Sequence, residues 1–140
     1  MAEALFREID HTADLGIEVE ADTPGELFCC AGRALFSLMV RPQGVNAHEI
    51  REETVQAEGW EDLCHDWLSR LLRQFLQGGF IAATITILDI DATHVHARLT
   101  GEKLDYERHG FETEIKAVTY HQLSVFCQDG RWRARVIFDV

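Results

Sequence analysis

The chain has 140 residues, and its 24 Asp and Glu against 13 Lys and Arg give a formal net charge of −11. The length suits one domain that buries roughly two-thirds of its unfolded surface. The 46% hydrophobic content argues against a disordered chain. Because phosphate contacts need clustered Lys and Arg, the acidic balance argues against direct binding of nucleic acid. The acidity names no partner, since a basic protein surface, a cation or solubility alone would each be compatible with it.

The four cysteines show no pattern typical of a disulfide framework. Cys29 and Cys30 are adjacent, Cys64 and Cys127 stand apart, and no C-x-x-C occurs. We expect small buried thiols in a reduced compartment. The first five residues lack the regions of a signal peptide, and no apolar run reaches the ~20 residues that a membrane helix needs. The sequence therefore predicts a soluble, cytoplasmic protein with no membrane contact.

The first predicted elements are a strand and a long helix. Residues 15–21 alternate between apolar and polar side chains, as in a half-buried strand. Thr23 is a typical N-cap, Pro24 suits the first helical position, and Glu26 completes a capping pattern. We expect the helix to end before Pro42. Its apolar positions recur with a helical period: Leu27, Phe28, Ala31, Ala34, Leu35, Leu38 and Met39.

A second helix and several strands follow. The helix is predicted over residues 60–77, where apolar side chains keep one face and Gly78-Gly79 supplies a stop. A hairpin turn is predicted at residues 128–131, Gln-Asp-Gly-Arg. Strands are expected on alternation and β-branched content over residues 50–57, 80–90, 93–99, 115–126 and 131–140.

The order of these elements predicts an α+β fold. Helices and strands are interleaved in the first half, whereas strands follow one another through short turns in the second half. No linker of disordered composition divides the chain. We therefore expect a single domain over residues 1–140, with two long helices packed on a mixed, mostly antiparallel β-sheet.

Two clusters of hard oxygen ligands stand near the ends of the chain. Asp10, His11 and Asp14 lie together before the first predicted strand, and they offer two carboxylates and an imidazole. The alternative there is a turn in which Asp10 and Thr12 bond their own backbone. At the other end, Asp139 and Val140 close an apolar strand, which we expect to be anchored in the sheet. A divalent cation would need a third acid to approach them.

Other candidate residues have simpler alternatives. His94 and His96 fit a zinc pair, but no further ligand has suitable spacing, so an exposed sheet face is the better interpretation. His109 is either an active-site residue or a hydrogen-bonded structural one. No phosphate-binding glycine loop and no nucleophile motif with local context occurs. An arginine stripe that pairs with glutamates is expected on the last strand, at Arg131, Arg133 and Arg135.

Several segments, taken in chain order, resemble the archease family. They span about residue 6 to residue 140, so the resemblance covers essentially the whole chain. The most specific are Asp-His-Thr-Ala-Asp at residues 10–14 and Lys-Ala-Val-Thr-Tyr-His at residues 116–121. The other matching segments are residues 15–16, 23–28, 62–63, 66–68, 71–72, 101–102, 109, 114–115 and 138–140.

The resemblance implies a small cytoplasmic protein cofactor, not an enzyme, that assists the GTP-dependent RNA-splicing ligase. That ligase takes a guanylyl group from GTP on a histidine and passes it to an RNA 3′-phosphate. Archease accelerates guanylylation and permits multiple turnover in tRNA splicing and RNA repair. The expected partner is therefore the ligase, and RNA is met only through it.

The resemblance also implies a divalent-metal site of the kind the family holds with calcium. Carried over to this chain, its ligands are Asp14, Asp139 and Val140, the last through backbone or terminal carboxylate oxygens. Asp10 and His11 would then orient the loop around these ligands. Candidates for contact with the ligase, or for bracing the site, are Lys116, Tyr120 and His121.

Two other functions stay open at this stage. A metal-dependent phosphoester hydrolase would use Asp14, Asp139 and His11, but no general base with a positioned partner is evident. A general chaperone-like modulator of tRNA-modifying enzymes would act on unrelated clients without a metal. The ligase cofactor is the leading hypothesis, the hydrolase is its main rival, and the chaperone comes third.

Overall fold

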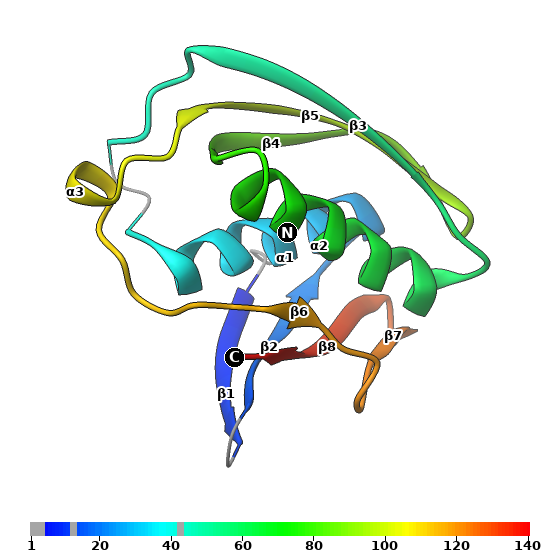
Figure 1. The fold of residues 1–140 in the computed structure, drawn as a ribbon. Helices are drawn as coiled ribbons and strands as arrows, with labels where there is room; N and C mark the ends of the chain where they lie inside the picture. Colours follow the sequence, from blue (N-terminus) through cyan, green and yellow to red (C-terminus); the bar gives the residue numbers. More distant parts are fainter. Residues whose placement is uncertain (1–4, 12–13, 42–43) are drawn as a thin grey trace.

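The structure is a computed structural model that describes residues 5–11, 14–41 and 44–140; within these, the side chains of residues 5, 9–11 and 14 are left out. Two antiparallel sheets enclose two long helices (Figure 1). In the first sheet β1, β2 and β8 are neighbours in that order, and β6 and β7 both pair with the far side of β8. Its strands are β1 (Leu5–His11), β2 (Asp14–Ala21), β6 (Ala117–Val118), β7 (Ser124–Gln128) and β8 (Arg131–Asp139).

The second sheet is a three-stranded layer in which β5 lies between the other two strands. Both of its strand pairs are antiparallel. The long strand β4 carries two register irregularities, between Ala82 and Thr84 and between Ile87 and Asp89, which let it curve over the helices. The strands are β3 (Glu49–Gln56), β4 (Phe80–Asp91) and β5 (His94–Lys103).

The two long helices, α1 (Pro24–Met39) and α2 (Trp60–Leu76), form the middle layer. The Thr23 side chain caps α1 by accepting a hydrogen bond from the Glu26 N–H at 3.2 Å. At the other end, the extended backbone of Val40 stops α1 and pairs with Phe111. A single turn, α3 (Tyr106–His109), follows β5.

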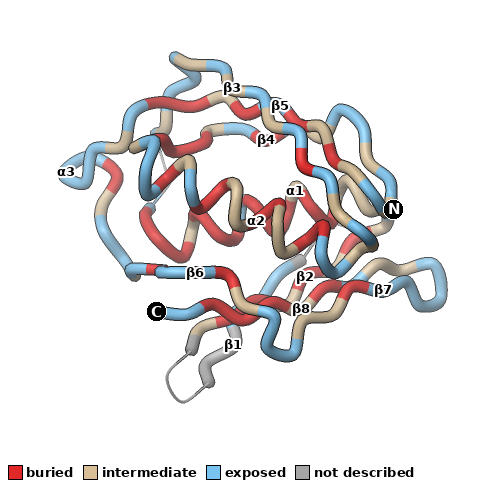
Figure 2. The backbone as a smooth tube through the Cα atoms, turned by 45° about the vertical axis from the view of Figure 1, so that its right-hand side comes forward, coloured by how far each residue is buried: buried red, intermediate tan, exposed pale blue. Residues whose placement is uncertain are grey.

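The core lies between the two sheets, where the buried faces of both helices pack (Figure 2). Phe28 and Trp67 are fully buried, and the Trp67 indole N–H donates to the Phe28 carbonyl at 3.0 Å. That bond satisfies the only polar group of the indole, so the ring contributes its whole apolar area to the core. Each such buried side chain contributes about 1.5–3 kcal/mol.

The structure confirms the predicted α+β class and both long helices. Two details of the prediction were wrong. The strands form two sheets instead of one, and every strand pair in the described part of the chain is antiparallel, so the sheet is not mixed. The wide apolar faces of α1 and α2 explain this, because a helix layer buried on both sides needs a sheet on each side.

The predicted strand over residues 115–126 was also wrong. Only β6 and β7 are extended there, and a turn separates them. The Thr119 hydroxyl accepts from the His121 N–H, and Gln122 has a φ of +53°, which a strand does not allow. Two elements were not predicted, the N-terminal strand β1 and the short α3.

Two further expectations can be compared with the structure. Cys30 and Cys64 are buried, Cys29 is half-buried and Cys127 is exposed; all four are free thiols. Burial raises the pKa of the Cys64 thiol to about 12, which keeps it unreactive. In the described part of the chain, no helix is long and apolar enough to cross a membrane.

Candidate metal centre and its neighbours

The end of β8 brings the two ends of the chain together. In the β2·β8 ladder Asp14 is the partner of Asp139, and in the β6·β8 ladder Ala117 is its partner on the other side. The Lys116 N–H also donates to the Asp139 carbonyl at 2.8 Å. Directly paired residues have α-carbons about 4.5–5.5 Å apart. The backbone therefore places Asp14, Asp139 and Lys116 together at one end of the strands of the first sheet. We call this end of the sheet the Asp139 edge.

The end of β8 passes from buried to exposed within one residue. Ile137 and Phe138 are buried, whereas Asp139 and Val140 are exposed. This confirms that the last strand is anchored in the sheet. The buried residues fix the backbone, so the α-carbon that carries the exposed Asp139 carboxylate is held in a defined place.

The donor set at this edge fits a hard divalent cation. Calcium and magnesium are bound by carboxylate and main-chain oxygens, and the edge offers two aspartates in register together with the oxygens of Val140. Among the side chains that the structure describes, no three His, Cys, Asp or Glu residues lie close enough to hold a metal ion. The Asp14 side chain is not among those described, so the three-ligand set stays a prediction.

Asp10 and His11 lie on the neighbouring strand of the same edge. In the β1·β2 register His11 is the partner of Asp14, and Asp10 is the partner of Leu15. Their backbones thus adjoin the predicted ligands, as residues that orient a metal loop would. Their side chains, and the predicted turn through Thr12, lie outside the described residues.

Residues 116–121 run past the end of β8. The Thr119 N–H and hydroxyl both donate to the Ile137 carbonyl, at 3.1 and 2.8 Å. Lys116, Tyr120 and His121 are exposed on this anchored segment. The segment is therefore held by backbone bonds, while its three candidate side chains face solvent.

One contact at this segment was not predicted. The Tyr120 ring stacks on His65 of α2, with centroids 3.9 Å apart and planes 12° apart. Burial raises the pKa of Tyr120, as do the charges of Asp66 and Asp62 and a hydrogen bond to Asp62. The i, i+3, i+4 spacing of Asp62, His65 and Asp66 on one helix face was the signal that could have indicated this cluster.

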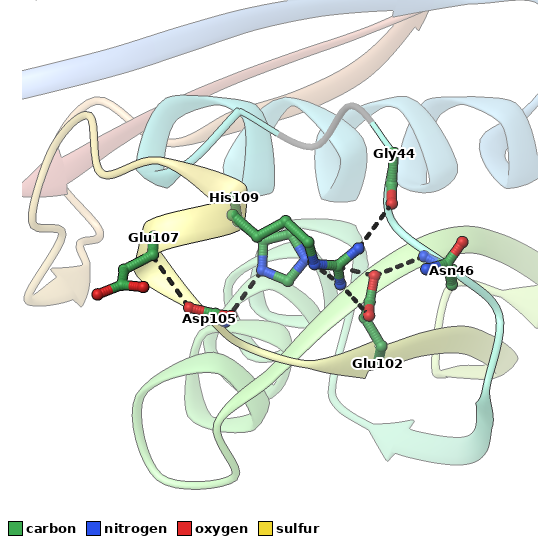
Figure 3. Close-up of polar contacts among 7 residues, drawn as sticks. Gly44, Asn46, Glu102, Asp105, Glu107 and His109 are labelled. Atoms are coloured by element: carbon green, nitrogen blue, oxygen red, sulfur yellow. Dashed lines mark hydrogen bonds and ion pairs between the residues drawn. The ribbon is translucent and has the colours of Figure 1, made fainter.

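His109 proves to be structural. It is fully buried, its Nδ1 accepts from the Asp105 N–H at 3.0 Å, and its Nε2 lies 3.3 Å from Glu102 Oε2 (Figure 3). Glu102 also accepts from the Asn46 N–H at 2.6 Å and pairs with Arg108. These contacts lower the pKa of Glu102, the Asn46 hydrogen bond most. The cluster ties α3 and the segment after α1 to the end of β5.

The remaining candidates of the sequence also have internal partners. His94 Nε2 lies 2.7 Å from Asp89 Oδ2, and that hydrogen bond raises the pKa of His94. His94 and His96 lie on a half-exposed sheet face without a third metal ligand among the described side chains. The arginine stripe pairs with acids of β2 and its end, through Arg131–Asp22, Arg133–Glu20 and Arg135–Glu18.

Comparison with known proteins identifies the family of the chain. The model of the Archease protein family matches residues 6–140. The chain belongs to the archease family. The match includes both ends of the chain, and with them the edge where β2, β6 and β8 meet.

Individual archeases agree over nearly the whole length. Protein archease of Methanopyrus kandleri is 36% identical, over 96% of this chain and 99% of its own. The solution structure of Methanobacterium thermoautotrophicum protein 1598 superposes with a TM-score of 0.81 at 31% identity, over 96% and 98% of the two chains. The Thermotoga maritima archease, described as a possible chaperone, has a TM-score of 0.66 at 23% identity and 96% coverage of both. The α+β fold is thus the fold of solved archeases.

Proposed function

We propose that this archease is a metal-binding protein cofactor that activates the GTP-dependent RNA-splicing ligase, promoting guanylylation and multiple turnover. One observation carries the proposal, the register that pairs Asp14 with Asp139 at the exposed end of β8. Membership of the archease family supports it, because the two most specific motifs of the chain meet at that edge.

Within this proposal the carboxylates of Asp14 and Asp139 and an oxygen of Val140 hold a divalent cation, calcium in the family-type site. When bound, the cation supplies positive charge that can attract phosphate oxygens. Without it, two neighbouring carboxylates repel each other. Lys116 is bonded through its backbone to Asp139, so its exposed ammonium is available to a phosphate near the same edge. The chain itself then performs no bond-breaking step.

The charge of the chain supports a protein partner over RNA. With a net charge of −11, the surface repels a phosphate backbone and attracts a basic protein. A ligase that handles GTP and RNA ends needs a basic active site. An acidic cofactor can approach that site in the cytoplasm without binding RNA itself.

Ligation by the cognate ligase, with and without this archease, tests the proposal. We expect the wild type to raise guanylylation and turnover, and Asp139→Asn to abolish that effect while the fold survives. The matched control is Asp89→Asn, which changes an exposed aspartate on the other sheet. Unchanged multiple-turnover ligation on adding the wild type would contradict the proposal. Chelator-sensitive phosphoester hydrolysis by the isolated protein would instead indicate an enzyme.

A second candidate is a general chaperone. It is favoured by exposed large apolar side chains on the described surface, among them Phe111, which is 57% exposed, and Ile50, which is 69% exposed. It predicts that the protein suppresses aggregation of unrelated clients. Because neither residue is among the proposed metal ligands, the suppression would persist in Asp139→Asn and in the presence of a chelator.

A further inference from the structure

The stacked pair of Tyr120 and His65 lies outside the proposed ligand set of the cation. His65 is fixed on both sides, because its Nδ1 lies 2.9 Å from Asp66 Oδ1 and its Nε2 lies 3.1 Å from the Val118 carbonyl oxygen. Tyr120 lies on this fixed ring, beside the carboxyl groups of Asp66 and Asp62, which, after burial, help to raise its pKa. The plane of the His65 ring and one face of Tyr120 are therefore set before any partner arrives.

Despite this anchoring, Tyr120 is 55% exposed. Since one ring face lies on His65, the exposed part consists of the other face and the ring edges. An exposed, pre-positioned tyrosine loses little conformational entropy on binding, which is why such residues are enriched among interface hot spots. The open face of Tyr120 is thus suited to receive a planar group.

The charges around the Tyr120 ring determine which kind of planar group its open face can bind. Asp62 and Asp66 of α2 flank Tyr120, and each brings a side-chain carboxyl group to the ring. The electron-rich face of an aromatic ring attracts a cation, and neighbouring carboxylates add to that attraction. The same carboxylates repel phosphates, which disfavours a nucleotide base carried on a nucleic-acid chain. A guanidinium combines a planar shape, weak hydration and donors for both carboxylates.

We propose that Tyr120, Asp62 and Asp66 together receive an arginine side chain of a basic protein partner. That the partner is the RNA-splicing ligase rests on the proposed function. Tyr120 follows Lys116 by one short, anchored segment, so an arginine seated on Tyr120 would place its protein against the Asp139 edge as well.

A titration that needs no ligase tests the arginine site directly. The probe is an acetylated, amidated Gly-Arg-Gly peptide, observed by NMR against the isotope-labelled archease. We expect saturable shifts of the Tyr120 and His65 ring signals, with half-saturation on the order of tens of millimolar for one cation–π contact. The matched peptide carries citrulline, which keeps the planar group without the charge. Equal shifts with citrulline, or none with arginine, would overturn the proposal.

Binding of the purified ligase tests the partner. We expect Tyr120→Leu to weaken binding roughly 3- to 30-fold, as loss of a cation–π contact does. Tyr120→Phe keeps the ring and should retain most of the affinity. Tyr106→Leu is the matched control, since Tyr106 is 50% exposed and packs edge-on against Phe75 and Phe111. Thermal unfolding of each variant confirms that the fold is kept.

The outcomes separate this inference from the proposed function. If the ligase binds wild type and Tyr120→Leu equally, while Asp139→Asn loses activation, the arginine site is overturned and the proposed function stands. If the ligase does not bind the wild type, the proposed function fails, and the peptide titration still decides the arginine site. Larger ring shifts with a short single-stranded RNA than with the arginine peptide would replace the proposal with base stacking.

Discussion

The polar clusters at the end of β8 and around α3 use the same residue types in opposite surroundings. Around α3, Glu102 and His109 are buried, and each polar atom has a partner within the chain. At the end of β8, Asp139 is exposed and has another aspartate, Asp14, as its strand partner. Satisfied polar groups stabilise a fold, whereas exposed groups of like charge are available to a ligand.

The largest effect on stability is expected from the buried cluster. His109→Ala should lower the free energy of unfolding by about 3 kcal/mol, because it leaves a cavity and removes one partner of Glu102 and the acceptor of the Asp105 N–H. Urea unfolding measures this loss. Ligase activation by the folded fraction should persist at low temperature. Wild-type stability in His109→Ala would contradict a structural role for this residue.

A smaller effect should appear in the way the free energy of unfolding falls at low pH. The hydrogen bond from Asn46, followed by the contacts with His109 and Arg108, lowers the pKa of Glu102 from the ordinary 4.5. A lowered carboxyl pKa stabilises the fold above pH 4.5, and that stabilisation is lost as pH falls through the folded-state pKa. In Glu102→Gln the free energy of unfolding should therefore fall less steeply as the pH drops below about 4.5.

The matched variant for that dependence on pH is Glu107→Gln, which changes an exposed glutamate of the neighbouring α3 turn. Its free energy of unfolding should fall at low pH as that of the wild type does. If the two variants behave alike, the buried contacts of Glu102 do not determine the acid stability.

The smallest effect on stability is expected at the β8 edge. Asp139→Asn should change the free energy of unfolding by less than about 0.5 kcal/mol, since the side chain is exposed. Urea unfolding in a chelator measures the change without a bound cation. A loss as large as that of His109→Ala would show that Asp139 has a structural role and would remove the contrast between the two clusters.

Local sequence signals predicted the elements better than their assembly. Thr23 and Glu26 marked the start of α1, and the apolar period gave both helix faces. Residues 115–126 looked like one strand because their apolar content is continuous, but the Thr119 side chain and the positive φ of Gln122 form a turn there. The four-residue α3 is too short for any period to reveal it.

The candidate site was predicted from the ends of the chain, but its assembly depends on long-range pairing. Nothing local in Asp14 or Asp139 indicates that they are strand partners, since β2 and β8 pair across the whole length of the chain. The family resemblance supplied that connection. The contact of Tyr120 with His65 was missed because it joins α2 to the turn after β6, and helix periodicity says only that His65 lies on the polar side.

Calcium titration of the purified protein, followed by isothermal calorimetry, tests the central claim most directly. The account predicts one ion per chain, with affinity at least about tenfold weaker in Asp139→Asn, since even outer residues of a metal site commonly cost 10- to 100-fold. Asp89→Asn should bind like the wild type. Equal calcium affinity in the wild type and Asp139→Asn, or no calcium binding by the wild type, would contradict it.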